Sequence, residues 1–297
     1  MFKNANIYRI GALPAMADVE DAAAANTFAA CFPTQQRSMG FVPARGIENG
    51  LFVELIAGAG ILRVKTETRS VPAATLKKEV ERRCAIVEDE TGRKPGKKQR
   101  KEITENAEMD LLPQAFSKYG EVLIWIDAAS KLLVLDTSNA ALSDAILTLL
   151  VRTCEGWMLS APVTTMASGP VMTAWLTDGC PECEEFDLGR DATLKSQDET
   201  KQQVVYTSSP LDTDEVKAYI RSGLAATKLG LTWKGRVSFR LTDSFGLRKI
   251  DPLDVTLDGG ATGHLDAFDA DVTIMTGELR PLIADLTAAH GGWVVPA

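Results

Sequence analysis

Histidine is nearly missing from this sequence. The 297 residues hold two, His264 and His290, both in segments that resemble ordinary loops. No Ser/His/Asp or Cys/His arrangement for nucleophilic catalysis is therefore indicated. The phosphate-binding patterns GxxxxGK(S/T) and strand-anchored GxGxxG are also missing. The sequence predicts a protein that is not an enzyme and that uses no cofactor.

Cysteine is sparse as well, with five in the chain. Cys31, Cys84 and Cys154 lie singly within apolar or helical patterns, which is typical of small buried side chains. Cys180 and Cys183 have the CxxC spacing of half a zinc site, but no second Cys pair or Cys/His pair follows at a usable distance. Two thiols in a loop are the favoured interpretation, and no metal site is predicted.

Long apolar runs do not occur. No stretch approaches the roughly 18 uninterrupted apolar residues that cross a bilayer, and the N-terminal residues lack the apolar core of a signal peptide. Apolar residues make up 45% of the chain and the net charge is −8, which fits a soluble globular protein. We therefore expect a cytoplasmic protein with no membrane partner.

Strand and helix patterns alternate along the chain and predict the α+β class. One mixed region is expected over residues 1–165 and a second over 166–297. In the first, a strand over 6–11 and an alanine-rich helix over 17–31 precede a loop at 32–46, where two prolines and two glycines occur. Near the C-terminus a helix is expected from Phe268 to Leu286, with a kink or restart at Pro281.

A charged helical hairpin interrupts the first region at about 72–113. Its first helix carries one apolar stripe, at helical spacing, made of Leu76, Val80, Cys84 and Val87. The turn and the start of the second helix hold the stretch GRKPGKKQRK, residues 92–101, with six cations and no acid. The pattern predicts an αα-hairpin that projects from the N-terminal region with its cations at the turn.

A second basic region extends from Lys217 to Lys249, with eight cations and one acid. Alternation along RVSFRL places Arg236, Ser238 and Arg240 on one face of a predicted strand. From residue 250 onward, eight acids accompany a single cation. The chain therefore separates its charges by region, although a basic run is often no more than a solvated face.

Two alternatives from other functional classes stay open on the residues alone. The acids Asp266, Asp269 and Asp271 could bind the metal ions of a nuclease, although their spacing is not that of a calcium loop. The basic hairpin could instead dock an acidic protein partner. An acidic surface loop and a solvated basic face are the simpler interpretations of the same residues.

Five ordered motifs resemble one known family. They are FKNANIYRI (2–10), MGFVP (39–43), LLPQAFSKYGEVLIWID (111–127), TKLGLTW (227–233) and FDADVTIMTGEL (268–279). Together they resemble the recombination-associated RdgC family. The resemblance implies a bacterial, nucleoid-associated protein that encircles double-stranded DNA as a ring-shaped homodimer with little sequence preference. It also implies that the protein restrains RecA-promoted strand exchange by occupying the DNA.

The resemblance and the charge pattern together suggest a set of site residues. Lys228 lies within the matching TKLGLTW motif and is the best candidate for a phosphate contact, and Lys118 is a weaker one. Phe116 matches an aromatic that closes the ring in that family, with core packing as the alternative. The full predicted DNA-binding set is Lys97, Lys98, Arg100, Lys101, Lys118, Lys228, Lys234 and Arg236.

Overall fold

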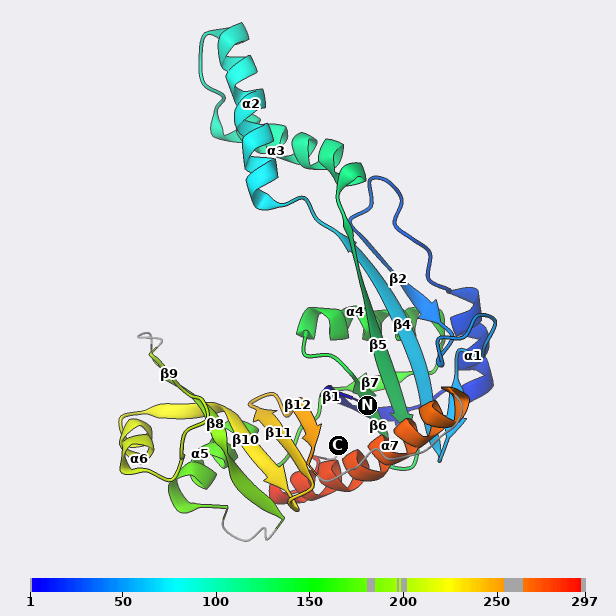
Figure 1. Ribbon diagram of the computed structural model, residues 1–297, viewed down its shortest axis with the longest axis vertical. Helices are drawn as coiled ribbons and strands as arrows, with labels where there is room; N and C mark the ends of the chain where they lie inside the picture. The colour runs from blue at the N-terminus through cyan, green and yellow to red at the C-terminus, as the bar shows by residue number, and fades with distance from the viewer. Residues whose placement is uncertain (1, 181–184, 197, 199–201, 254–263, 295–297) are drawn as a thin grey trace.

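The computed structural model describes residues 2–180, 185–196, 198, 202–253 and 264–294, with the backbone alone for 264–266. Within these residues the chain forms seven α-helices and one continuous antiparallel sheet (Figure 1). The hydrogen-bonded strand order is β2-β4-β5-β6-β1-β12-β11-β10-β8-β9, with β3 beside β4 and β7 beside β1. The predicted α+β class is confirmed.

The strands are β1 (Asn4–Ala12), β2 (Arg37–Val42), β3 (Glu54–Ile56), β4 (Ala59–Arg69), β5 (Ser117–Asp127), β6 (Leu132–Leu135), β7 (Met158–Ser160), β8 (Phe186–Ser196), β9 (Gln203–Tyr206), β10 (Leu224–Trp233), β11 (Val237–Thr242) and β12 (Leu247–Pro252). The helices are α1 (Met16–Ala25), α2 (Ala73–Thr91), α3 (Lys97–Leu111), α4 (Ala140–Thr153), α5 (Ser168–Asp178), α6 (Asp214–Arg221) and α7 (His264–Ala289).

The N-terminal half of the sheet is covered on both faces. Ile124 and Leu133 point toward α1 and α4, where they join a core with Val19 and Ile146. Trp125, on the opposite face of β5, belongs to the core that contains α7. Both faces of β5 and β6 are therefore apolar because each face has a helix to pack against.

The C-terminal half of the sheet is covered on one face only. Phe239 and Leu241 of β11 pack with Trp175 of α5 and with Leu282 and Leu286 of α7. Strand β1 joins the two halves, because it pairs with β6 through Asn6–Arg9 and with β12 through Asn4 and Ala5. Among the described residues, no helix packs on the other face of β8, β10, β11 and β12, which carries the hollows described below. The predicted division of the chain near residue 165 stays a prediction.

The expected helical hairpin is present as α2 and α3 and projects from the ends of β4 and β5 (Figure 1). Val80 is 5% exposed and Ala107 is fully buried, so the two helices pack along a narrow apolar seam. The stripe predicted on the first helix is the less exposed side of α2. Gly92 ends α2 in the left-handed conformation, with φ of 68°, as a helix C-cap requires.

Two sequence predictions on the backbone were wrong. The loop expected over 32–46 contains β2, which pairs with β4 from Arg37 to Val42. Gly40 lies in this strand, paired with Lys65, and glycine is required there because a Cβ would come within 2.5 Å of the Phe28 Cα. Helix α7 continues through Pro281, so the expected restart is wrong and the expected kink stays a prediction.

Three further sequence features are placed by the fold. His290 follows α7 directly and is fully buried between the rings of Trp175 and Phe245, so the expectation of an ordinary surface loop was wrong for this residue. Cys31 and Cys154 are buried as expected. The CxxC motif lies mostly outside the described residues, because Cys183 is among those left out. No described helix combines the length and apolar character needed to cross a membrane.

Candidate nucleic-acid interface

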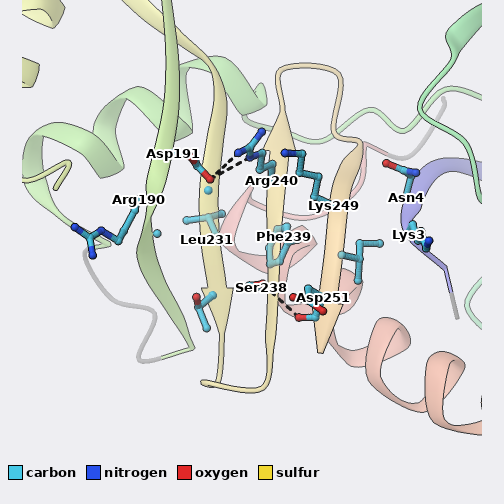
Figure 2. Close-up of a pocket in the computed structure, with 14 residues that line it drawn as sticks. Lys3, Asn4, Arg190, Asp191, Leu231, Ser238, Phe239, Arg240, Lys249 and Asp251 are labelled. Carbon is cyan, nitrogen blue, oxygen red and sulfur yellow. Dashed lines mark hydrogen bonds and ion pairs between the residues drawn. The ribbon is translucent and has the colours of Figure 1, made fainter. Parts of the chain in front are cut away.

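The open face of the C-terminal sheet carries a wide groove of about 790 Å³. Its polar lining comes from four strands and the N-terminal segment, as Figure 2 shows for Arg190, Asp191, Arg240, Lys249 and Lys3. A second, smaller hollow continues from it, and Asp191 and Arg240 line both. Lys228 lines the second hollow. Cationic residues of five separate segments therefore line the two hollows.

Strand alternation explains why cations occupy this face. Val237, Phe239 and Leu241 are buried against the helices, so Ser238 and Arg240 point to the opposite side. This confirms the alternation expected along RVSFRL for Ser238 and Arg240, whereas Arg236 precedes β11 and pairs instead with Glu278 of α7. Residues opposite each other in neighbouring strands share a face, and Lys228 lies opposite Thr242, two positions from the pair formed by Gly230 and Arg240. Lys228 and Arg240 therefore stand on the same surface.

Irregular pairing occurs in two of the strand pairs that border the groove, whereas β10 pairs with β11 in a regular register. Register shifts lie between Ala226 and Lys228 and between Leu229 and Leu231 in the pairing of β10 with β8. Another lies in the pairing of β11 with β12, next to Lys249, whose φ is 49°. A β-bulge re-aims side chains, and a left-handed lysine is uncommon and costs backbone energy. The irregular pairing therefore changes the directions in which the side chains of Lys249 and of the β8 residues point.

Two glycines let β8 and β10 approach closely beneath the groove. A Cβ on Gly189 would lie 2.9 Å from the carbonyl carbon of Gly230, a distance that real Cβ atoms do not reach. A Cβ on Gly230 would lie 3.1 Å from the Asp191 carbonyl oxygen. Side chains are therefore excluded from this part of the floor, which leaves room above the backbone.

An ion pair lies where the two hollows adjoin. Asp191 Oδ2 accepts hydrogen bonds from Arg240 Nη2 at 2.7 Å and Nε at 3.2 Å (Figure 2). The Ser208 backbone N–H donates to the other oxygen, Oδ1, at 3.2 Å. Partial burial works against ionisation of the carboxyl, but the hydrogen bonds from Arg240 and Ser208 outweigh it. They hold the pKa of Asp191 below its ordinary value.

The basic residues of the hairpin lie far along the molecule from this groove. Lys97, Lys98, Arg100 and Lys101 are exposed in the first two turns of α3. Of these, Lys101 contacts Glu105 at 3.7 Å. Lys97 and Lys98 line a concave surface of about 690 Å³ at the hairpin tip, together with Arg93 and Lys94. Lys118 is exposed at the start of β5, near the base of the hairpin.

Lys234 and Arg236 occupy the turn between β10 and β11, at the end of β10 away from Lys228. Lys234 Nζ lies 2.6 Å from Glu185 Oε2 and 3.1 Å from Asp285 Oδ2. Arg236 pairs with Glu278 of α7. These two predicted DNA contacts are thus beside the acids of α7, and carboxylates already neutralise their charges.

Phe116 is 96% exposed, so it is not a core residue within the single chain. It immediately precedes Ser117, whose hydroxyl donates to the fully buried carboxylate of Glu67 at 2.5 Å. Glu67 also accepts from the Cys31 backbone N–H at 2.7 Å and from Arg69 Nε at 3.1 Å. The bonds from Ser117, Cys31 and Arg69 lower the pKa of Glu67. These hydrogen bonds fix the backbone next to Phe116 to the buried Glu67, while the ring of Phe116 is exposed to solvent.

The acids considered for a nuclease do not converge among the described side chains. Asp269 Oδ1 pairs with Arg45 at 2.7 Å, and the side chain of Asp266 lies outside the described residues. No group of three or more His, Cys, Asp or Glu side chains within the described part of the chain is placed to hold a metal ion.

Sequence reasoning missed the groove partners of Lys228. Arg240 was expected on the basic face, but Asp191, Arg190 and Lys249 were not singled out as site residues. Their signal is weak, because the bulges that bring them together depend on long-range pairing. Gly189 and Gly230 within two strands were the available hint, since glycine in a strand marks a bulge or a close backbone approach.

Comparison with known proteins gives matches over nearly the whole chain. A family model described as "Putative exonuclease, RdgC" matches residues 1–293. The recombination-associated protein RdgC of Bordetella pertussis (strain Tohama I) is 33% identical over 297 residues, covering 98% of each chain. The protein of the same name from Janthinobacterium sp. (strain Marseille) is 35% identical over 299 residues, covering 99% of this chain and 98% of that one. The resemblance suggested by the five motifs is thereby confirmed, and this chain belongs to the RdgC family.

Proposed function

We propose that this protein binds double-stranded DNA without sequence preference. The observation that carries the proposal is the open sheet face, where Lys228, Arg240 and Lys249 line two hollows that share Asp191 and Arg240. Lysine and arginine on such a surface attract phosphates, and phosphate contacts carry no base sequence directly. Membership of a recombination-associated family supports nucleic acid as the partner. The site of action is then the nucleoid, in the cytoplasm.

The basic hairpin supplies a second contact region in this proposal. Its four predicted cations, Lys97, Lys98, Arg100 and Lys101, lie in the first two turns of α3, in the hairpin that extends away from the main body (Figure 1). Duplex DNA that touches both regions would be held at two separated points. Lys118 lies between them along the chain. Lys234 and Arg236 are expected to contribute less, because Glu185, Asp285 and Glu278 already pair with them.

The protein is proposed to act as a ring-shaped homodimer, with Phe116 in one of the two contacts that close the ring. Support comes from the 96% exposure of its side chain and from the hydrogen bond between the adjacent Ser117 and the buried Glu67. Large apolar rings left in solvent are typical anchors of protein interfaces. A dimer around DNA would restrain RecA-dependent strand exchange by occupying the duplex.

Salt dependence tests the binding mechanism most directly. We expect the logarithm of the affinity for a random-sequence duplex to fall linearly with the logarithm of salt concentration, with a slope of about −0.9 for each phosphate neutralised. AT-rich and mixed duplexes should compete equally. Affinity that does not change with salt, or strong preference for one sequence, would contradict phosphate contacts as the mechanism.

A nuclease is the second candidate, because the matching family model carries the word exonuclease in its description. We propose that the protein is not an enzyme and acts on DNA by binding it. The two functions separate in one experiment, in which end-labelled linear duplex and closed plasmid are incubated with purified protein and Mg²⁺ or Mn²⁺. Intact substrates support the binding role. Cutting or shortening that follows the protein through purification and stops with chelator would replace it.

Docking of an acidic protein by the hairpin is the third candidate. Retention of the protein on immobilised duplex is compared with retention on an immobilised acidic polypeptide at equal charge density. The DNA-binding proposal requires stronger retention on duplex. It also requires that reversal of Lys97, Lys98, Arg100 and Lys101 to Glu weakens this retention.

A further inference from the structure

Arg240, the cation that lines both hollows, is already paired with a carboxylate. Arg240 gives two hydrogen bonds to one oxygen of Asp191, at 2.7 and 3.2 Å. The two side chains are 29% and 31% exposed, respectively, so a ligand arriving from solvent can reach both. A phosphate offers Arg240 the same planar, charge-assisted contact that the carboxylate now makes. Arg240 cannot fully make both contacts at once.

Asp191 is held in place by more than its partner. The Ser208 N–H binds its other oxygen at 3.2 Å, and the β8 segment that carries it follows the irregular pairing at Gly189. Its main chain lies against Gly230, where no side chain fits. Loss of Arg240 to another ligand would therefore leave the Asp191 carboxylate where it is, with its charge still in the groove.

We propose that Asp191 is an internal competitor that opposes duplex binding by occupying Arg240 and by repelling phosphate. This inference rests on the proposed function and names the residue that limits the affinity of this face. Binding at Arg240 exchanges one anion for another, so the contact releases fewer counterions than an unpaired arginine would release. Lys228 differs from Arg240 here, because among the described residues it makes no ion pair and its charge is fully available.

The consequence for function is a weak contact between Arg240 and a phosphate, because Arg240 can return to Asp191. A carboxylate that stays beside the arginine offers it an alternative partner each time a phosphate leaves. Contacts of this kind shorten the residence time more than they slow association, because most affinity differences within one interface lie in the dissociation rate. Asp191 would thereby keep the protein mobile on DNA.

The test compares Asp191→Asn with wild type and with Asp212→Asn. Asp212 also pairs with a cation, Lys217, at 2.8 Å, but it does not line the groove. Both variants change the net charge equally. We expect Asp191→Asn to bind random-sequence duplex about three- to tenfold more tightly, as expected for removing a charge about 6 Å from a phosphate at an effective dielectric constant of about 40 to 80, since the site is open to water. The salt slope should steepen by about 0.9, while Asp212→Asn should match wild type.

Arg240→Gln provides an independent comparison if Asp191→Asn folds poorly. This variant leaves Asp191 without its cation and should weaken binding, and adding Asp191→Asn to it should restore part of the affinity. Salt-sensitive binding by wild type, together with equal or weaker binding by Asp191→Asn, would overturn this inference and leave the proposed function standing. If no variant and no wild-type protein binds duplex even at low salt, the proposed function fails and the inference fails with it.

Discussion

Lys228 and Lys234 are two exposed lysines on the same strand and its turn, but their surroundings differ. Lys234 is within 2.6 Å of Glu185 and 3.1 Å of Asp285, whereas Lys228 makes no ion pair with any described residue. If the protein neutralises DNA phosphates, only a lysine without a carboxylate partner releases a full counterion equivalent. Lys228→Ala should therefore weaken binding more than Lys234→Ala does.

The size of the effect follows from the salt dependence. One phosphate contact contributes a slope of about −0.9, so a roughly fourfold rise in salt, from about 50 to 200 mM, reduces affinity by a factor of about 3.5 per contact. Lys228→Ala should flatten the slope by about one unit per subunit. In a dimer with two such contacts, the difference between wild type and variant over that salt range should be about twelvefold.

Fluorescence anisotropy with a random-sequence duplex measures both variants across the salt series. Lys234→Ala is the matched control, because it removes the same side chain from the same sheet. Its slope should stay close to that of wild type. Equal slopes for wild type and Lys228→Ala would refute the phosphate contact at Lys228. Equal losses in the two variants would show that the ion pairs of Lys234 do not decide its role.

Three further outcomes are expected from other parts of the fold. Phe116→Ala should keep the wild-type unfolding midpoint, because the ring is 96% exposed, and should stay a dimer in sedimentation through the other contact, but it should lose retention of closed circular DNA; a lowered midpoint or wild-type retention would contradict this. Arg280→Ala should cost about 3 kcal/mol in urea unfolding, since it leaves the fully buried Asp127 without the partner at 2.5 Å, and adding Asp127→Asn should recover most of that loss. Burial lowers the pKa of His290, so unfolded chains bind the proton first, and stability should fall by at most about 1.4 kcal/mol per pH unit as pH drops below about 6.5. His290→Asn should show a smaller fall over that range in unfolding midpoints, and an unchanged fall would show that other groups cause it.

Local patterns predicted the hairpin well because its information is local. An apolar residue every three or four positions makes α2 amphipathic whatever the rest of the chain does, and Val80 is indeed its buried residue. Strand β2 was missed for the opposite reason. Its pairing partner is β4, more than twenty residues away, and Gly40 serves close packing against Phe28. A glycine in sequence does not reveal which of these roles it has.

The site divides in the same way. Alternation along β11 placed Ser238 and Arg240 correctly, because a strand exposes every second side chain. The environment of Phe116 was undecided between core and surface, since its exposure depends on how the hairpin leaves the sheet. The sequence could not predict that Asp191 pairs with Arg240, because 49 residues separate them and the irregular pairing of β8 with β10 determines their contact.

The distribution of partners, more than the number of cations, explains how a chain with a net charge of −8 can present a basic surface. Helix α7 lies on the face of the sheet opposite the groove, and its acids Glu278 and Asp285 reach the turn that holds Arg236 and Lys234. Carboxylates therefore neutralise the charges of Lys234 and Arg236 in this turn. Lys228 stands at the other end of β10, where the described acids that remain near the groove are few and Asp191 is already bound to Arg240. Counting charges along the sequence treats these cations as equal, but the attraction between a cation and DNA depends on whether a carboxylate must first be displaced.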